Sequence, residues 1–166
     1  MKLTGLLCVC LSVALSGAYL FRRAAKRTAV LELFSEYFAF LSSESESSGG
    51  DLKTLLENCA LKFGGRFPFA EELRERYGES GDIPSSWISC AAKYSGFIKK
   101  NEREAVDSFS GVFGSLSKKE FRGECERRRR KLGEESLLAL QKLKTTGKLT
   151  VAFSSLLAAL VFIIFI

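Results

Sequence analysis

Five consecutive cations, Arg127–Lys131, are the densest group of chemically distinctive side chains in the sequence. Guanidinium groups pair bidentately with carboxylates and phosphates, so the run could bind an acidic protein partner or anionic lipid. Consecutive helical residues point in different directions, so we expect the cations to encircle their helix rather than form one face. A solvated surface paired with neighbouring glutamates stays open as the alternative. The sequence predicts partner binding by Arg127, Arg128, Arg129 and Arg130.

The usual catalytic constellations are missing from the sequence. It has no histidine, which removes Ser-His-Asp and Cys-His machinery in their usual forms. Ser115 and Lys118 have the spacing of one serine–lysine motif, but its companion elements are lacking. We expect the carboxylates to be solvated, and a membrane enzyme acting through them is a less favoured alternative. The sequence therefore predicts a protein that is not an enzyme and uses no cofactor.

The cysteines do not form a recognisable site either. There are five, an odd number, and no C-x-x-C pair occurs among them. This spacing predicts neither a disulfide framework nor a metal centre. The cysteines are Cys8, Cys10, Cys59, Cys90 and Cys125.

Nucleic acid is not expected as a partner of the basic run, because aromatic residues do not alternate with its cations.

Two uncharged stretches close the ends of the chain. The 19 residues Leu3–Phe21 would form a helix of roughly 28 Å, and the 18 residues Leu149–Ile166 one of roughly 27 Å. Both lengths are close to the ~30 Å hydrocarbon core of a bilayer. The sequence therefore predicts two transmembrane helices and a lipid bilayer around them.

Cations flank both stretches on the side of the intervening chain. Lys and Arg beside an apolar stretch hold that flank in the cytoplasm, so the middle is predicted to be cytoplasmic with both termini outside. The alternative is a secreted helical protein with a signal peptide cleaved near Ser16–Ala18 and a C-terminal tail anchor. The residues predicted to determine topology are Arg22, Arg23, Lys26, Arg27, Lys142, Lys144 and Lys148.

The middle of the chain has helical periodicity throughout. Apolar residues recur at i, i+3, i+4 and i+7 from Val30 to Leu41, and again from Leu52 to Phe63. The polar stretch Ser42–Gly50 is predicted to be a loop, and Gly78–Pro84 a turn. Trp87 is expected to pack inside the bundle. The segment that begins at Ser117 is expected to have a sparser apolar stripe, made of Phe121, Cys125, Leu132, Leu140 and Leu143. The predicted fold is all-α, with transmembrane helices at 1–21 and 149–166 flanking a small cytoplasmic helical bundle at 22–148.

Several stretches resemble the stage III sporulation protein AB family of endospore-forming bacteria. Arg22–Leu41 resembles its basic patch and the helix that follows, and Asp82–Ser95 its short helix with a central Trp. Phe109–Leu132 resembles the region that usually reads L-G-x-x-D-x-x-x-Q: Gly114 matches the glycine, while Ser117 and Phe121 stand near the aspartate and glutamine. Lys148–Ile166 resembles the family's final transmembrane span in its apolar character, without a shared motif.

The resemblance implies a structural role in a membrane complex. The family's cytoplasmic bundle is similar to that of the inner-membrane platform protein of type II secretion systems. The implied location is the mother-cell membrane facing the forespore, within a channel complex between the two cells. The implied partners are a secretion-type ATPase, stage III sporulation protein AA, and other membrane subunits of the channel. Independently of the resemblance, both uncharged stretches carry small residues at helical spacing, such as Ser12 and Ser16, which allow either packing of the two spans on each other or contact with further copies of the chain.

Overall fold

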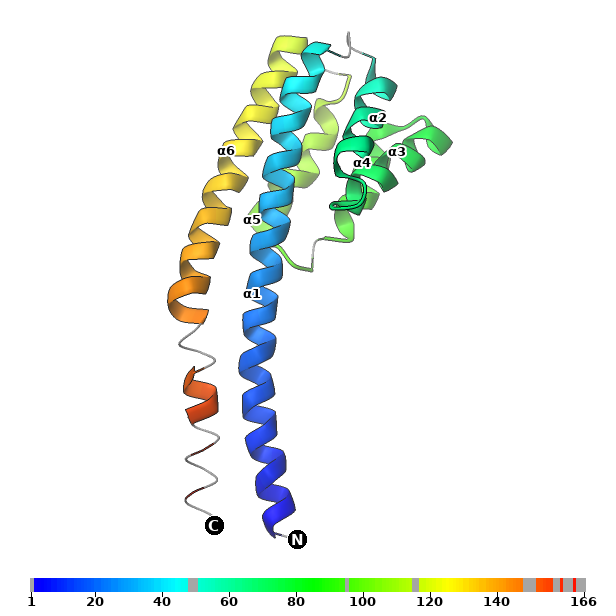
Figure 1. Ribbon diagram of the computed structural model, residues 1–166. Coiled ribbons are helices and arrows are strands. Elements are labelled where there is room, and N and C mark those ends of the chain that lie inside the picture. Colours follow the sequence, from blue (N-terminus) through cyan, green and yellow to red (C-terminus); the bar gives the residue numbers. More distant parts are fainter. Residues whose placement is uncertain are drawn as a thin grey trace. The chain divides into compact units, whose positions relative to one another are not determined.

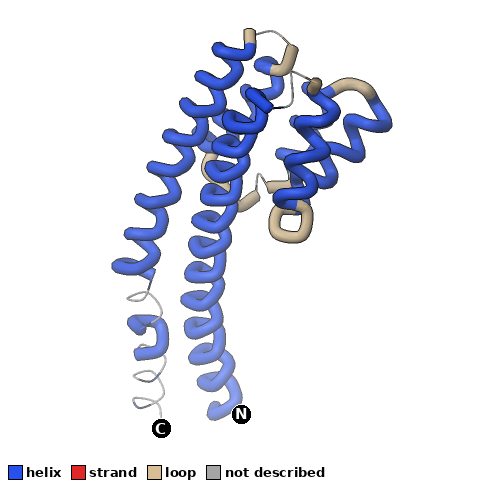
Figure 2. The backbone as a smooth tube through the Cα atoms, turned by 45° about the horizontal axis from the view of Figure 1, so that its top comes forward, coloured by secondary structure: helices blue, strands red, loops and turns tan. Residues whose placement is uncertain are grey.

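The computed structural model describes residues 2–47, 51–94, 96–114, 117–147, 152–156, 159 and 163, and every regular element among them is helical (Figure 1). Short loops join the helices, as Figure 2 shows. The all-α prediction is therefore confirmed. The elements are α1 (Lys2–Ser47), α2 (Leu52–Phe63), α3 (Pro68–Ser80), α4 (Ile83–Ala92), α5 (Lys100–Asp107), the 3₁₀ helix η1 (Ser108–Val112), α6 (Lys118–Lys142) and the π-helix η2 (Leu143–Gly147).

The chain divides into two compact units. Unit 1 comprises residues 1–29 and 136–166, and unit 2 comprises residues 30–135. The long helices α1 and α6 each contribute to both. These units are defined by packing, whereas the predicted boundaries after residues 21 and 148 rest on charge and hydropathy and stay predictions.

An aromatic cluster forms the core of unit 2. The apolar stripe of α1 supplies Phe34, Tyr37 and Phe38, all fully buried. Their rings meet rings from the α2–α3 turn, α3, α4 and η1; the centroids of Phe34 and Phe67 are 5.0 Å apart and those of Phe38 and Phe109 4.7 Å apart. Edge-to-face pairs of this kind contribute beyond the apolar area they bury. The core is thus built from segments up to 71 positions apart in the sequence.

Trp87 lies at the centre of this cluster. Its side chain is fully buried, and its indole Nε1 donates a hydrogen bond to the carbonyl oxygen of Val106 at 2.8 Å. The ring contacts those of Phe69 on α3 and Phe113 after η1, with centroids 5.0 and 5.4 Å apart. The prediction that Trp87 packs inside the bundle is confirmed.

Helix α1 extends further than predicted. The stretch Ser42–Ser47 was predicted to be part of a loop but is helical. Its hydroxyls bond to the helix itself, since Ser45 Oγ donates to the carbonyl of Ser42 at 2.8 Å. Glu44 ties the same turn to α2 by accepting from Asn58 Nδ2 at 2.7 Å. Hydrogen bonds within α1 and the contact with α2 therefore outweigh the tendency of these serines to form a loop.

The turn between α3 and α4 is shorter than the predicted Gly78–Pro84. It consists of Gly81 and Asp82 alone. Gly81 has φ +66°, a left-handed conformation that glycine adopts at little cost, and its amide closes α3 by donating to Tyr77 O at 2.8 Å. Pro84 then falls in the first turn of α4, where its missing N–H costs nothing.

The inward stripe of α6 also differs from the predicted one. Cys125 and Leu132 are fully buried as expected, but Leu140 is 36% exposed. The buried positions after Leu132 are Ser136 and Ala139, which continue the helical spacing. Their side chains are small, so a search for large apolar residues missed them and selected Leu140 instead.

The two predicted membrane spans stay predictions. In the part of the chain that the structure describes, no helix combines the length and the apolar character that crossing a membrane requires. The second predicted span, 149–166, lies largely outside the described residues. The first forms the beginning of α1.

Candidate interaction surface on helix α6

The basic run lies on the part of α6 that packs against α1 within unit 2. Ser35 Oγ donates to the carbonyl oxygen of Arg129 at 3.1 Å. A Cβ added at Gly133 would lie 3.2 Å from the same hydroxyl, so this glycine permits the close approach of the two helices. Cys125 and Leu132 are fully buried on either side of the run. These contacts fix which way each arginine points.

The four arginines do not share one face. The Arg127 side chain is 74% exposed and that of Arg128 only 18%. Arg129 is half-buried and Arg130 exposed. The expectation that the run encircles its helix is confirmed, and its outward-facing members are Arg127 and Arg130.

Neighbouring glutamates form ion pairs with three of the four arginines. Glu124 lies 2.8 Å from Arg127 and 3.6 Å from Arg128, and Glu126 lies 2.8 Å from Arg129. The hydrogen bond from Arg129 lowers the pKa of Glu126. A helical pair with an exposed arginine, such as Arg127 with Glu124, contributes only about 0.3–0.5 kcal/mol, so a more strongly binding acidic partner could replace it. Within the described residues, Arg130 makes no ion pair.

Arg128 has a further unusual feature. Its Nε is buried without a hydrogen-bond acceptor in the described structure, although the other end of the guanidinium approaches Glu124. A half-buried guanidinium with one unsatisfied donor is a poor surface contact. Arg128 therefore belongs to the α6 packing face more than to a docking surface.

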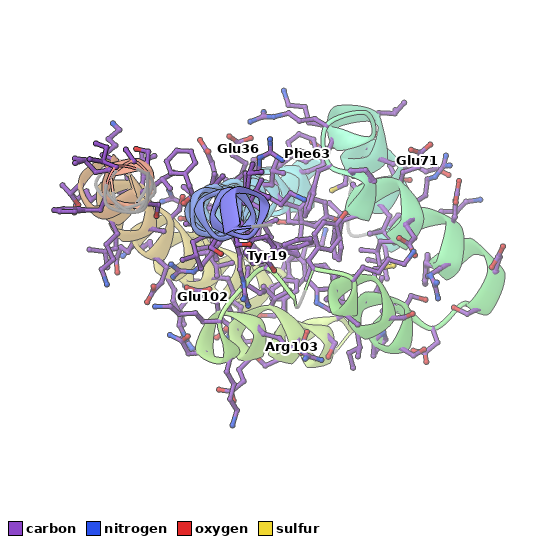
Figure 3. All side chains as sticks on the ribbon, turned by 90° about the horizontal axis from the view of Figure 1, so that it is seen from below. Tyr19, Glu36, Phe63, Glu71, Glu102 and Arg103 are labelled. Carbon is purple, nitrogen blue, oxygen red and sulfur yellow. The ribbon has the colours of Figure 1, made fainter. Side chains whose placement is uncertain are left out.

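An acidic surface lies on α3 of the same unit. A shallow depression of about 700 Å³ runs along it, lined by Glu71, Glu72, Glu75, Glu79 and Lys93 among others. Figure 3 shows Glu71 on the side of α3 away from α1. Glu72 contacts Lys93 at 2.6 Å and Arg76 at 3.0 Å. Partial burial raises the pKa of Glu72, but these hydrogen bonds outweigh it and hold the pKa below its usual value.

Cys59, Cys90 and Cys125 are all buried and unreactive. Burial raises the pKa of both Cys59 and Cys125 to about 12, and that of Cys90 to about 11. Because the thiolate is the nucleophile and the metal-binding form, these thiols are inert near pH 7. Among the described residues no group of histidine, cysteine or acidic side chains could hold a metal ion.

One carboxylate contradicts the expectation of solvated acids. Glu102 is fully buried, at the start of α5. Its Oε2 accepts a hydrogen bond from the backbone amide of Lys99 at 2.6 Å, as the third residue of a helix does in a capping box. The signal was present in the sequence as a glutamate three residues after the helix start. Glu102 therefore has a structural role.

Comparison with known families decides the chain's relationship. The family model of stage III sporulation protein AB matches residues 2–166. The chain belongs to the stage III sporulation protein AB family. No curated protein and no solved structure gives a significant match. Membership in this family indicates a role in stage III of sporulation.

The structure explains how this member of the stage III sporulation protein AB family accommodates its departures from the L-G-x-x-D-x-x-x-Q pattern. Gly114 has φ +77°, a conformation that favours glycine. Ser117 stands near the aspartate and caps α6: its hydroxyl oxygen accepts from the amide of Glu120 at 3.4 Å, and Glu120 Oε2 in turn accepts from the amide of Ser117 at 2.9 Å. Serine and aspartate are both good caps, so either residue suits this position. Phe121 packs on Phe109 and Phe113, with ring centroids 5.7 Å away in each case.

Proposed function

We propose that this protein is a non-enzymatic membrane subunit that anchors a helical bundle in the cytoplasm as a platform for a secretion-type ATPase. In a sporulating cell the platform would lie in the mother-cell membrane around the forespore, as part of a channel complex. Family membership supplies the sporulation role. The membrane, platform and ATPase components are our proposal, supported by the residues discussed below.

The observation that carries the proposal is the continuity of α1. A single helix of 46 residues begins in the uncharged stretch, passes through the four cations Arg22–Arg27, and ends in the aromatic core of unit 2. A signal peptide cleaved near Ser16–Ala18 would cut this helix. An anchor that continues into a folded cytoplasmic bundle keeps it whole, and the cations that follow the uncharged stretch favour retention of that flank in the cytoplasm.

Cysteine labelling in intact cells tests the proposed topology. The starting variant carries Cys8→Ser and Cys10→Ser, so that its native thiols are the three buried ones. We expect Ser43→Cys, an exposed position on α1, to resist a membrane-impermeant maleimide until the cells are broken. In non-sporulating cells that produce the chain, where the outer face of the membrane is open to the medium, a cysteine appended after Ile166 should react while the cells are intact. The opposite labelling pattern would contradict the topology.

A binding experiment tests ATPase docking through the basic run. Capture of the ATPase by the detergent-solubilised chain should weaken severalfold when Arg127, Arg129 and Arg130 are replaced by glutamine, and most at low salt, where exposed charges act furthest. We keep Arg128 in this variant because of its packing role and test Arg128→Gln separately.

The matched control replaces three exposed lysines of unit 2, Lys53, Lys62 and Lys100, by glutamine. It removes the same charge from other helices, so capture should change little. If both variants fold and bind as tightly as the parent, the run is a solvated surface and does not dock the ATPase. Equal weakening by both would indicate attraction to net charge without a specific surface.

A further inference from the structure

The charges of this chain are strongly segregated between its two units. Eight of its 25 basic residues lie in unit 1, which contains no Asp or Glu. The remaining 17 stand against all 19 acidic residues in unit 2. Unit 2 is therefore nearly balanced within itself. Unit 1 has a net charge of +8 from its side chains and needs counter-charge from outside its own residues.

The packing of unit 1 brings two groups of cations to the same height along its helices: Arg22–Arg27 on α1, and Lys142 and Lys144 at and after the end of α6. Ser136 Oγ approaches the carbonyl oxygen of Thr28 at 3.5 Å, and both residues are buried. Helices α1 and α6 run in opposite directions here (Figure 1). Arg22 lies six residues before Thr28 and Lys142 six residues after Ser136, so both lie about 9 Å along their helices from the contact.

The side chains of both clusters reach the surface. Arg22, Arg23, Lys142 and Lys144 are all exposed. We call these four residues the basic belt. Arg22 and Arg23 directly follow the uncharged stretch of α1, which ends at Phe21. Lys142 and Lys144 lie seven and five residues before Leu149, where the uncharged C-terminal stretch begins, so the belt lies close to the edge of both predicted spans.

We propose that the basic belt binds the phosphate groups of anionic phospholipids at the cytoplasmic face of the membrane. Guanidinium groups bind phosphate oxygens in a bidentate manner, and ammonium groups bind them as point charges. Cations beside a membrane span are attracted to an anionic leaflet, and they act within a Debye length of ~8 Å. The belt lies at the predicted span edge, whereas the run Arg127–Lys131 is 18 residues or more from Leu149. This inference rests on the membrane insertion proposed above.

Lipid retention by the full-length chain tests the inference. The purified protein is reconstituted in vesicles of nine parts phosphatidylcholine to one part phosphatidylglycerol, then re-extracted in mild detergent, and the retained lipids are quantified by mass spectrometry. We expect phosphatidylglycerol to be enriched severalfold over its share in the vesicle. The enrichment should disappear when all four belt residues are replaced by glutamine, and should decrease at high salt.

A matched variant separates the belt from net charge. Lys53, Lys62, Lys100 and Lys119 are exposed on unit 2, and replacing them by glutamine removes the same charge. This variant should retain the full enrichment. If the parent retains both lipids in their vesicle proportions, or if the control loses as much enrichment as the belt variant, the inference is overturned and the cations serve orientation only.

Carbonate washing of the same vesicles keeps the two proposals distinguishable. Protein that stays in vesicles of pure phosphatidylcholine as well as in the mixture is inserted whatever the belt does. Insertion without enrichment overturns the belt and leaves the membrane subunit. Release from both kinds of vesicle overturns the membrane subunit, and the belt with it. Circular dichroism of each variant verifies that its helices are intact.

Discussion

Trp87→Ala is expected to destabilise the protein by about 3–5 kcal/mol, the usual cost of removing a large buried aromatic side chain. The fully buried ring lies between the aromatic residues of α1, α3 and η1. Its loss also leaves the carbonyl oxygen of Val106 without the indole donor. Thermal and denaturant melts of the full-length chain in detergent, followed by circular dichroism, would measure the effect.

Ile88→Ala is the matched control for this substitution. Ile88 is the next residue of α4 and is 49% exposed, so its truncation should change stability by no more than about 0.5 kcal/mol. Trp87→Phe should restore part of the packing and none of the hydrogen bond. If Trp87→Ala melted with the parent and lost only partner binding, Trp87 would be an interface residue and the core described above would be wrong.

The second large effect is an alkaline loss of stability. Burial raises the pKa of Cys59 and Cys125 to about 12 in the folded protein, whereas thiols in an unfolded chain titrate near ~8.5. Below the unfolded value both states keep the protons, and the full stability is present. Above it the unfolded chain releases protons that the folded chain retains, so stability falls as pH rises, by up to ~1.4 kcal/mol per pH unit for each thiol.

Melts between pH 8 and pH 11 would measure this dependence. Lysines and tyrosines also titrate there, so the informative quantity is the difference in slope between the parent and a Cys59→Ala, Cys125→Ala variant. The parent should lose stability more steeply, even though the variant starts from a lower value because of the cavities it contains. Parallel curves would show that the thiols titrate alike in both states.

Sequence periodicity predicted the helices well where one apolar stripe decides the structure. Helix α2 begins at Leu52 and ends at Phe63, as its pattern and the following glycines indicate. The buried stripe of α1 likewise matches its i, i+3, i+4 spacing. In both cases the local pattern and the tertiary contacts agree, so no knowledge of the partner helices was needed.

Prediction failed where polar or small residues take part in packing. The serines after Leu41 continue α1 because their hydroxyls bond to carbonyls of α1 itself and Glu44 joins this turn to α2, which composition alone does not reveal. Ser136 and Ala139 replace larger residues on the inner face of α6 because the helices approach closely there. The hydrogen bond between Trp87 and Val106 joins residues of different helices and leaves no trace in either one's local pattern.

The basic run illustrates the same difference for the candidate site. Its encircling arrangement followed from helical geometry and is confirmed. The division into outward Arg127 and Arg130 and inward Arg128 depends on the register of α6 against α1, which is set by Ser35 and Gly133. No feature of five consecutive cations reveals that register. Its function in partner binding stays a prediction.

The aromatic core has a consequence for synthesis of the chain. Phe38 leaves the ribosome 71 residues before Phe109, the ring that lies 4.7 Å from it in the folded protein. At a synthesis rate of ~5–20 residues per second, the apolar stripe of α1 is made roughly 4–14 s before Phe109, with which it packs in the folded protein. During that interval a nascent chain exposes three large aromatic side chains on its first helix. Such a stripe is a natural binding site for chaperones or the insertion machinery, and bacteria deprived of these factors should accumulate this protein as aggregates.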